Sequence, residues 1–344
     1  MNSTILTSRK PGYGIALFAT LFAFLVIGLG AFTRLADAGL GCPDWPGCYG
    51  HALWPQTETD VAAAEQLYPD APVEHDKTWP EMVHRYLATS LGLLAIALLV
   101  VCVRKREKGQ PFKHTVFLLG LVIIQGLFGM WTVTLKLWPQ VVTAHLLGGF
   151  LTAATLWLLT LRLSGKIWRT AGPGKRKLRK LYPFTLLATF ILLLQIGLGG
   201  WTTSNYAAVA CPDFPTCQQQ WLPEMDFGEG FNVFQGIGPN YLGGTMDNSA
   251  RVAIHFAHRI GAIIASLFVL VVIVRLYLAS QLPAAKRLSV LILVVLFTQI
   301  GLGISNVVLH FPVAVAVAHN ACGALLLVCM ITALHRLFSV EILR

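Results

Sequence analysis

The chain has 344 residues, of which 55% are hydrophobic and 12% are charged. So few charged side chains cannot cover a globule of this size, and the composition therefore excludes both a disordered chain and an ordinary soluble protein. In a soluble protein the formal net charge of +10 would suggest nucleic acid as a partner. Here the placement of the charges indicates a membrane protein with no nucleic-acid partner.

Eight apolar stretches reach the length of about 20 residues that crosses the hydrocarbon core of a bilayer. The first, near residues 12–34, is too long for the apolar part of a signal peptide and lacks a clear cleavage site, so we expect it to be retained. The others lie near residues 79–103, 114–134, 140–163, 181–202, 250–278, 287–309 and 312–336. The sequence therefore predicts an all-α integral membrane protein with eight transmembrane helices.

The connections between these stretches alternate in charge. The two termini and the connections near residues 104–113, 162–180 and 275–287 hold 20 of the 26 Lys and Arg residues, but only two of the 16 acidic residues. By the positive-inside rule these segments are cytoplasmic, so both termini lie inside and the long loops 35–78 and 203–249 are external. No organellar targeting segment precedes the first span, and the bacterial inner membrane is the expected location of this multi-pass protein.

Four of the seven cysteines form two close pairs in the external loops, Cys42 with Cys48 and Cys211 with Cys217. Because an external compartment is oxidising, two local disulfides are expected. The spacing differs from the C-x-x-C of a thiol oxidoreductase, and neither loop has its own set of four zinc ligands. These disulfides either stabilise their loops or have a redox role with an external thiol partner.

The two halves of the chain repeat one four-helix unit. Four residues of the first half recur 174 positions later: His84, Arg85, Gln125 and His145 correspond to His258, Arg259, Gln299 and His319. The motifs CPDWPGC (42–48) and CPDFPTC (211–217) also repeat, as does a glycine pattern that is typical of close helix packing. We therefore expect two four-helix bundles, residues 1–170 and 171–344, related by a pseudo-twofold axis along the membrane normal.

Each predicted bundle contains two histidines at matching depth, near the external end of its spans. Bundle cores bind metals and cofactors with side chains from facing helices, and two imidazoles without further carboxylates or thiolates fit bis-histidine ligation of a haem iron better than zinc or a di-iron centre. Arg85 and Arg259 directly follow a histidine. They either pair with haem propionates, since guanidinium groups bind carboxylates well, or anchor the helix end at the interface.

The halves differ at one position in this pattern. Glu81 precedes His84 by three residues, whereas the corresponding residue of the second half is His255. Residues at i and i+3 share a helix face, so the carboxyl group of Glu81 is expected beside whatever His84 binds. An ionisable group inside a membrane is costly and indicates a functional site. A catalytic haem site beside an electron-transferring one explains the divergence.

The sequence resembles the haem A synthase family, of the CtaA/Cox15 type, over essentially its whole length. The resemblance depends on Thr33-Arg34-Leu35, Gly39-Leu40, the Cys42 to Cys48 motif, Glu81-x-x-His84-Arg85, His145, Cys211, Cys217, His258-Arg259 and His319. Each motif alone is weak, but together, in this order and on eight spans, they are specific.

The resemblance implies oxidation of the C8 methyl group of haem O to a formyl group, through a hydroxymethyl haem, for cytochrome oxidase biogenesis. It implies haem b as the cofactor, ligated by His258 and His319, and a substrate haem O held at His84 and His145. Glu81 matches the essential acidic residue of the family. Haem O synthase, a farnesyltransferase, and the membrane lipid are the expected partners.

Other classes of membrane protein explain less of the pattern. A non-catalytic dihaem electron-transfer cytochrome accounts for four histidines but not for the Glu81/His255 difference. A transporter would bind its substrate near the bilayer midplane through broken helices, which the spans do not indicate. A thiol-redox protein is disfavoured by the cysteine spacing.

Overall fold

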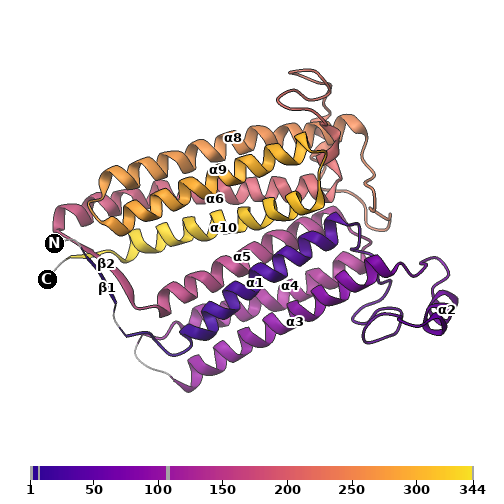
Figure 1. Cartoon of the computed structure of the whole chain (residues 1–344), viewed down its shortest axis with the longest axis horizontal. Coiled ribbons are helices and arrows are strands. Elements are labelled where there is room, and N and C mark those ends of the chain that lie inside the picture. Colours follow the sequence, from indigo (N-terminus) through magenta and orange to yellow (C-terminus); the bar gives the residue numbers. More distant parts are fainter. Residues whose placement is uncertain (1–2, 7, 106–108, 343–344) are drawn as a thin grey trace.

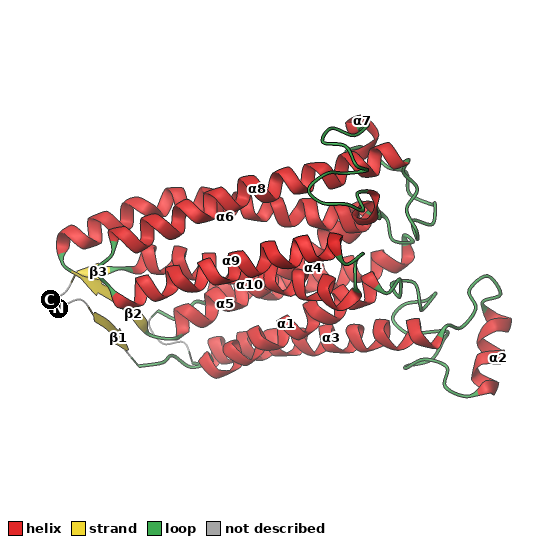
Figure 2. Ribbon diagram, turned by 45° about the horizontal axis from the view of Figure 1, so that its top comes forward, coloured by secondary structure: helices red, strands yellow, loops and turns green. Residues whose placement is uncertain are grey.

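The computed structural model describes residues 3–6, 8–105 and 109–342 and consists almost entirely of helices (Figures 1 and 2). Eight of them are long and apolar enough to cross a membrane: α1 (Tyr13–Leu35), α3 (His75–Arg104), α4 (Phe112–Thr134), α5 (Pro139–Leu163), α6 (Gly172–Ser204), α8 (Asn248–Ala279), α9 (Pro283–Val308) and α10 (Val313–Ser339). All eight predicted spans are confirmed. Helix α6 begins nine residues before the predicted span because its first turns consist of the basic residues that precede the apolar stretch.

The helices form two groups of four that lie side by side (Figure 1). In the first group contacts run around the ring α1–α3–α4–α5, and in the second around the ring α6–α8–α9–α10. The predicted boundary between residues 170 and 171 falls between strand β2 (Lys166–Thr170) and α6. In the following text these groups are called the first and the second bundle.

Helices α5 and α10 lie at the contact between the bundles. Helix α5 packs against α6 and α10, and α10 also packs against α1. The most apolar part of α10 is 50% buried and that of α5 39%, against 11% for α4, as expected for helices covered by protein on several sides. In the repeat, α1 corresponds to α6 and α5 corresponds to α10. The contact of α5 with α6 and that of α10 with α1 are therefore equivalent contacts between the two units. The pseudo-twofold axis and the cytoplasmic placement of both termini stay predictions.

A small sheet lies at the end of the molecule where the two termini meet (Figure 2). Strand β1 (Ser3–Leu6) pairs antiparallel with β2, and β2 pairs parallel with β3 (Glu341–Ile342). The sequence analysis did not predict these strands, because each is short and its partner is more than 150 residues away in the chain. The connection between the bundles is thus fixed by both ends of the chain.

The loops at the opposite end contain the short helices α2 (Glu58–Leu67) and α7 (Phe227–Gly230) and the 3₁₀ helix η1 (Ala207–Ala210). Part of the second loop crosses to the first bundle. Trp138 Nε1 donates to the carbonyl of Gln235 (3.0 Å), Gln140 Nε2 to that of Val233 (2.9 Å), and Tyr241 N to that of Lys136 (3.0 Å). This loop, which the sequence left without an assignment, ties the two bundles together at the end where the histidines lie.

Candidate functional site

His84 of α3 and His145 of α5 face each other inside the first bundle. Their ring centroids are 6.4 Å apart and the ring planes are nearly perpendicular, at 88°. A bond between a metal and an imidazole nitrogen is about 2 Å long, so one metal ion fits between these two rings. The structure thus brings together the two histidines that the sequence paired.

Each of the four histidines lies against a glycine of a neighbouring helix. A Cβ atom added to Gly30 of α1 would lie 2.7 Å from the ring of His84, and one added to Gly199 of α6 would lie 3.2 Å from that of His258. The same holds for Gly129 with His145 at 3.5 Å and for Gly303 with His319 at 3.1 Å. The repeated glycines therefore do more than allow close helix packing, because they make room for the imidazole rings.

Two glutamines accompany the histidines of the second bundle. Gln195 of α6 has its Nε2 atom 3.0 Å from Nδ1 of His258, and Gln299 of α9 has its Nε2 atom 3.3 Å from Nε2 of His319. His258 and His319 are close enough to interact electrostatically. The sequence analysis had Gln299 in its repeat but gave neither glutamine a role at the site.

The donor atoms of these sites suit a haem iron. The Nδ1 atoms of His84, His145 and His319 are buried without a hydrogen-bond partner, and such orphaned atoms call for an explanation, which ligation by these imidazole rings provides. Among the described residues no three His, Cys, Asp or Glu side chains converge as metal ligands. Each bundle thus offers two imidazoles packed against glycines, a donor set that suits bis-histidine ligation of a haem iron.

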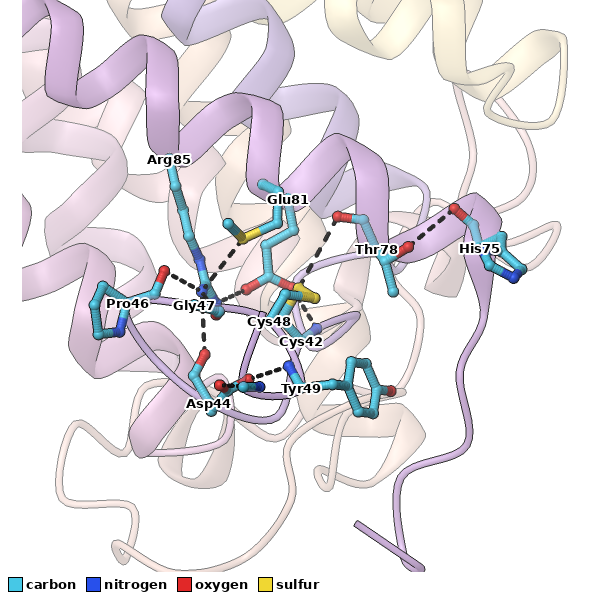
Figure 3. Close-up of a disulfide and its surroundings, with 12 residues drawn as sticks. Cys42, Asp44, Pro46, Gly47, Cys48, Tyr49, His75, Thr78, Glu81 and Arg85 are labelled. Carbon is cyan, nitrogen blue, oxygen red and sulfur yellow. Dashed lines mark hydrogen bonds and ion pairs between the residues drawn. A yellow bond between two sulfur atoms is a disulfide. The ribbon is translucent and has the colours of Figure 1, made fainter. Parts of the chain in front are cut away.

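Glu81 is buried one helical turn before His84, with 4% of its surface exposed. Its Oε2 atom accepts a hydrogen bond from the backbone N–H of Cys42 at 3.0 Å, and its Oε1 atom forms an ion pair with Arg85 (Figure 3). A buried carboxylate needs such partners to offset its desolvation. The loop that contains Cys42 and helix α3 together hold this acidic group against the first bundle.

The loop over Glu81 is closed by the predicted disulfide between Cys42 and Cys48. Nη1 of Arg85 donates to the carbonyl groups of Asp44 (3.0 Å) and Pro46 (3.2 Å), and the carboxylate of Asp44 accepts the N–H groups of Tyr49 (2.6 Å) and Gly50 (2.9 Å) (Figure 3). Burial raises the pKa of Tyr49 to about 12, so this phenol stays neutral while it donates to the carbonyl of Pro72. The guanidinium group of Arg85 is thus bound to the carbonyl groups of the cysteine loop above it.

The loop that contains Cys211 and Cys217 repeats this arrangement. Cys211 and Cys217 form the other predicted disulfide, and Arg259 donates to the carbonyl groups of Thr216 (2.7 Å) and Asp213 (2.8 Å). The side chain of Asp213 accepts N–H groups of the following turn, and the hydroxyl of Thr216 helps to hold the pKa of this carboxyl below its usual range. Both arginines therefore fix loop carbonyls in this structure, and pairing with haem propionates stays a prediction. The bundles differ in what lies beneath the loop, Glu81 in the first and the buried His255 in the second.

Replacing Arg85 by alanine is expected to loosen only the first cysteine loop. Hydrogen bonds to a charged group contribute about 1.5–3 kcal/mol each, so amide hydrogen exchange of residues 42–50 should accelerate by roughly tenfold or more in exchange mass spectrometry. Arg259→Ala is the matched control, which should accelerate residues 211–219 and leave 42–50 unchanged. Equal exchange of the first loop in wild type and Arg85→Ala would contradict this role.

Comparison with known proteins agrees with this geometry. The profile of a family described as cytochrome oxidase assembly protein (COX15-CtaA) matches residues 13–331. A haem A synthase of Shewanella oneidensis is 46% identical, over 91% of this chain and 92% of its own length. Haem A synthases of Caulobacter vibrioides and Agrobacterium fabrum are 30% and 28% identical; the first match covers 95% of this chain and 96% of the relative, the second 91% and 86%.

Proposed function

The chain belongs to the haem A synthase family of cytochrome oxidase assembly proteins, and we propose that it oxidises the C8 methyl group of haem O to a formyl group through a hydroxymethyl haem. With water as the oxygen donor, the balance is one methyl group and one water giving one formyl group, four protons and four electrons. The first step removes two electrons and two protons, and the second step removes the same number.

The observation that carries this proposal is the difference between two otherwise similar bundles. Both have a pair of neighbouring histidines, glycines against the rings and an arginine-held cysteine loop, but among the described residues only the first has a buried carboxylate, Glu81, one helical turn before a histidine. A pure electron carrier has no use for a buried acid at one of two sites. An oxidation that releases protons requires a group that accepts them.

His84 and His145 are the proposed ligands of the substrate haem O, and His258 and His319 those of a resident haem b. When bound, haem b would supply one-electron redox chemistry, by which the four electrons would leave one at a time for an electron acceptor outside the protein. The chain's own contribution in the second bundle is to hold the ligands with α8 and α10 and to exclude water from them.

Glu81 is the proposed proton acceptor and orients the attacking water. Its position on the same helix face as His84, three residues away, puts its carboxyl group beside the substrate site. The Cys42 N–H and the Arg85 guanidinium fix the carboxylate so that it does not have to reorganise during the reaction.

The proposed location is the bacterial inner membrane, with both cysteine loops on the external side, where disulfides form. Haem O synthase is the proposed source of the substrate. The alternative role of the first disulfide is thiol exchange with an external redox partner. Full activity of a Cys42→Ser variant would exclude this role.

The proposal is tested by expression in a host that makes haem O but not haem A. The extracted haems of the purified protein are separated by chromatography and identified by mass. Haem A or its hydroxymethyl precursor, together with haem b, is the expected result. Haem b alone, with haem O demonstrably present in the host, would refute it and favour the non-catalytic dihaem electron-transfer cytochrome.

A further inference from the structure

Gln195 of α6 makes a contact in the second bundle that the first bundle lacks. Its Nε2 atom lies 3.0 Å from Nδ1 of His258 and 3.0 Å from the carbonyl oxygen of the same residue, while its Oε1 atom is buried without a partner. The opposing residue on α8 is Gly261, where a Cβ atom would overlap the amide. The glutamine is therefore fitted into a space that α8 leaves for it beside the ligand histidine.

The corresponding position of α1 is Val26. The segments Gly28-Leu29-Gly30 and Gly197-Leu198-Gly199 are counterparts, because Gly30 faces His84 as Gly199 faces His258. Four residues before these facing glycines are Val26 and Gln195. A ring nitrogen of His84 lies at the backbone carbonyl of Val26, a residue whose side chain offers no hydrogen-bonding group. At this position the ring of His258 thus has a side-chain amide beside it, whereas the ring of His84 has backbone alone.

This difference matters for a histidine that binds iron. An imidazole that ligates through Nε2 carries its hydrogen on Nδ1, and the acceptor of that hydrogen sets the ring orientation and raises the basicity of the ligand. A half-turn of the Gln195 amide brings its unpartnered Oε1 to Nδ1 of His258. The turned Oε1 must also move away from the carbonyl oxygen of His258, which lies inside α8 and keeps a helical N–H.

We propose that Gln195 is a positioning residue, whose Oε1 accepts the Nδ1–H of His258 and retains haem b, whereas the lack of a side-chain amide at Val26 allows the substrate haem at His84 to exchange. The inference rests on the proposed assignment of the two haem sites. It explains how two copies of one unit serve as a permanent and a transient haem site. The ligands themselves are the same, and the difference lies in the residue behind one of them.

The first test replaces Gln195 by valine, the residue of the first bundle. Partners behind a metal ligand typically contribute 10–100-fold in affinity, so the haem b affinity of purified Gln195→Val is expected to fall by about 10–100-fold. The midpoint potential of the remaining haem b should rise, because a less basic imidazole stabilises ferric iron less. Gln195→Glu keeps an acceptor oxygen and should retain haem b without this rise. Wild-type haem b content and potential in Gln195→Val would overturn the proposal.

The reciprocal variant Val26→Gln provides the matched control. It is expected to leave the haem b content and potential unchanged and to slow the release of haem O from the first bundle, measured by transfer to apomyoglobin. Unchanged release would overturn the second half of the proposal. The two proposals fail through different measurements. The proposed function is refuted if the wild-type protein forms no haem A, whereas the haem b measurements on Gln195→Val test the role of Gln195 whether or not haem A is formed. Size-exclusion profiles identify variants that do not fold.

Discussion

Glu81→Gln is expected to stop haem A formation while haem b stays bound. General acid–base groups contribute typically about 10²–10⁴-fold to a rate, and the yield of haem A should fall by that factor. Glutamine keeps an oxygen that accepts the Cys42 N–H, so the loop above the site should retain its conformation. The measurement is the haem A to haem b ratio in extracts of the purified variant.

Glu74→Gln is the matched control for this variant. Glu74 lies just before α3, is exposed and pairs with Lys77, away from the histidines, so its replacement should leave haem A formation at the wild-type level. A normal haem A yield from Glu81→Gln would remove Glu81 from the reaction. Loss of haem b together with haem A would instead show that Glu81 supports the fold of both bundles.

His258→Ala is expected to abolish both haem b binding and haem A formation, whereas His84→Ala should abolish only the latter. Loss of a residue that would ligate the iron should cost at least as much as loss of a residue behind it, about 10–100-fold in affinity. Haem b is quantified by the absorption of its pyridine complex, per mole of purified protein. This pair of variants separates the two sites, because the same change is made at corresponding positions of the repeat.

His75→Ala provides a control for histidine removal. His75 is exposed at the start of α3, and its replacement should leave both haem readouts unchanged. If His84→Ala loses haem b and His258→Ala retains it, the assignment of the sites to the bundles is reversed. If both variants keep haem b, the histidine pairs are not its ligands.

Much of the candidate site could be predicted from the sequence because its signals are local or repeated. The pairing of His84 with His145 followed from their matching depth in the spans, and the geometry brings them within 6.4 Å. Glu81 was placed beside His84 from helical spacing alone. The two disulfides followed from cysteine pairs only six positions apart in external loops.

The roles of other residues could not be predicted, because they depend on which helix faces meet. Arg85 and Arg259 were considered for haem propionates or for the interface, and the structure shows them bound to the carbonyl groups of their own cysteine loops. Gln195 meets His258 because α6 packs against α8. A side chain this long reaches several groups, and the sequence does not tell which of them it meets.

The sequence by itself determined the eight spans and the two disulfides, and it predicted the orientation and the chemistry of the four histidines and Glu81. Hydropathy and charge are properties of single segments, and the repeat is a fixed spacing in the sequence, so all three can be recognised without knowing which helices are neighbours. The tertiary structure decided the arrangement of the bundles, the glycine spaces under the imidazoles, the sheet that joins both termini to the connection, and the crossing of the second loop to the first bundle. Those contacts join residues that are far apart in the chain, and only the packing of complete helices determines which of them meet.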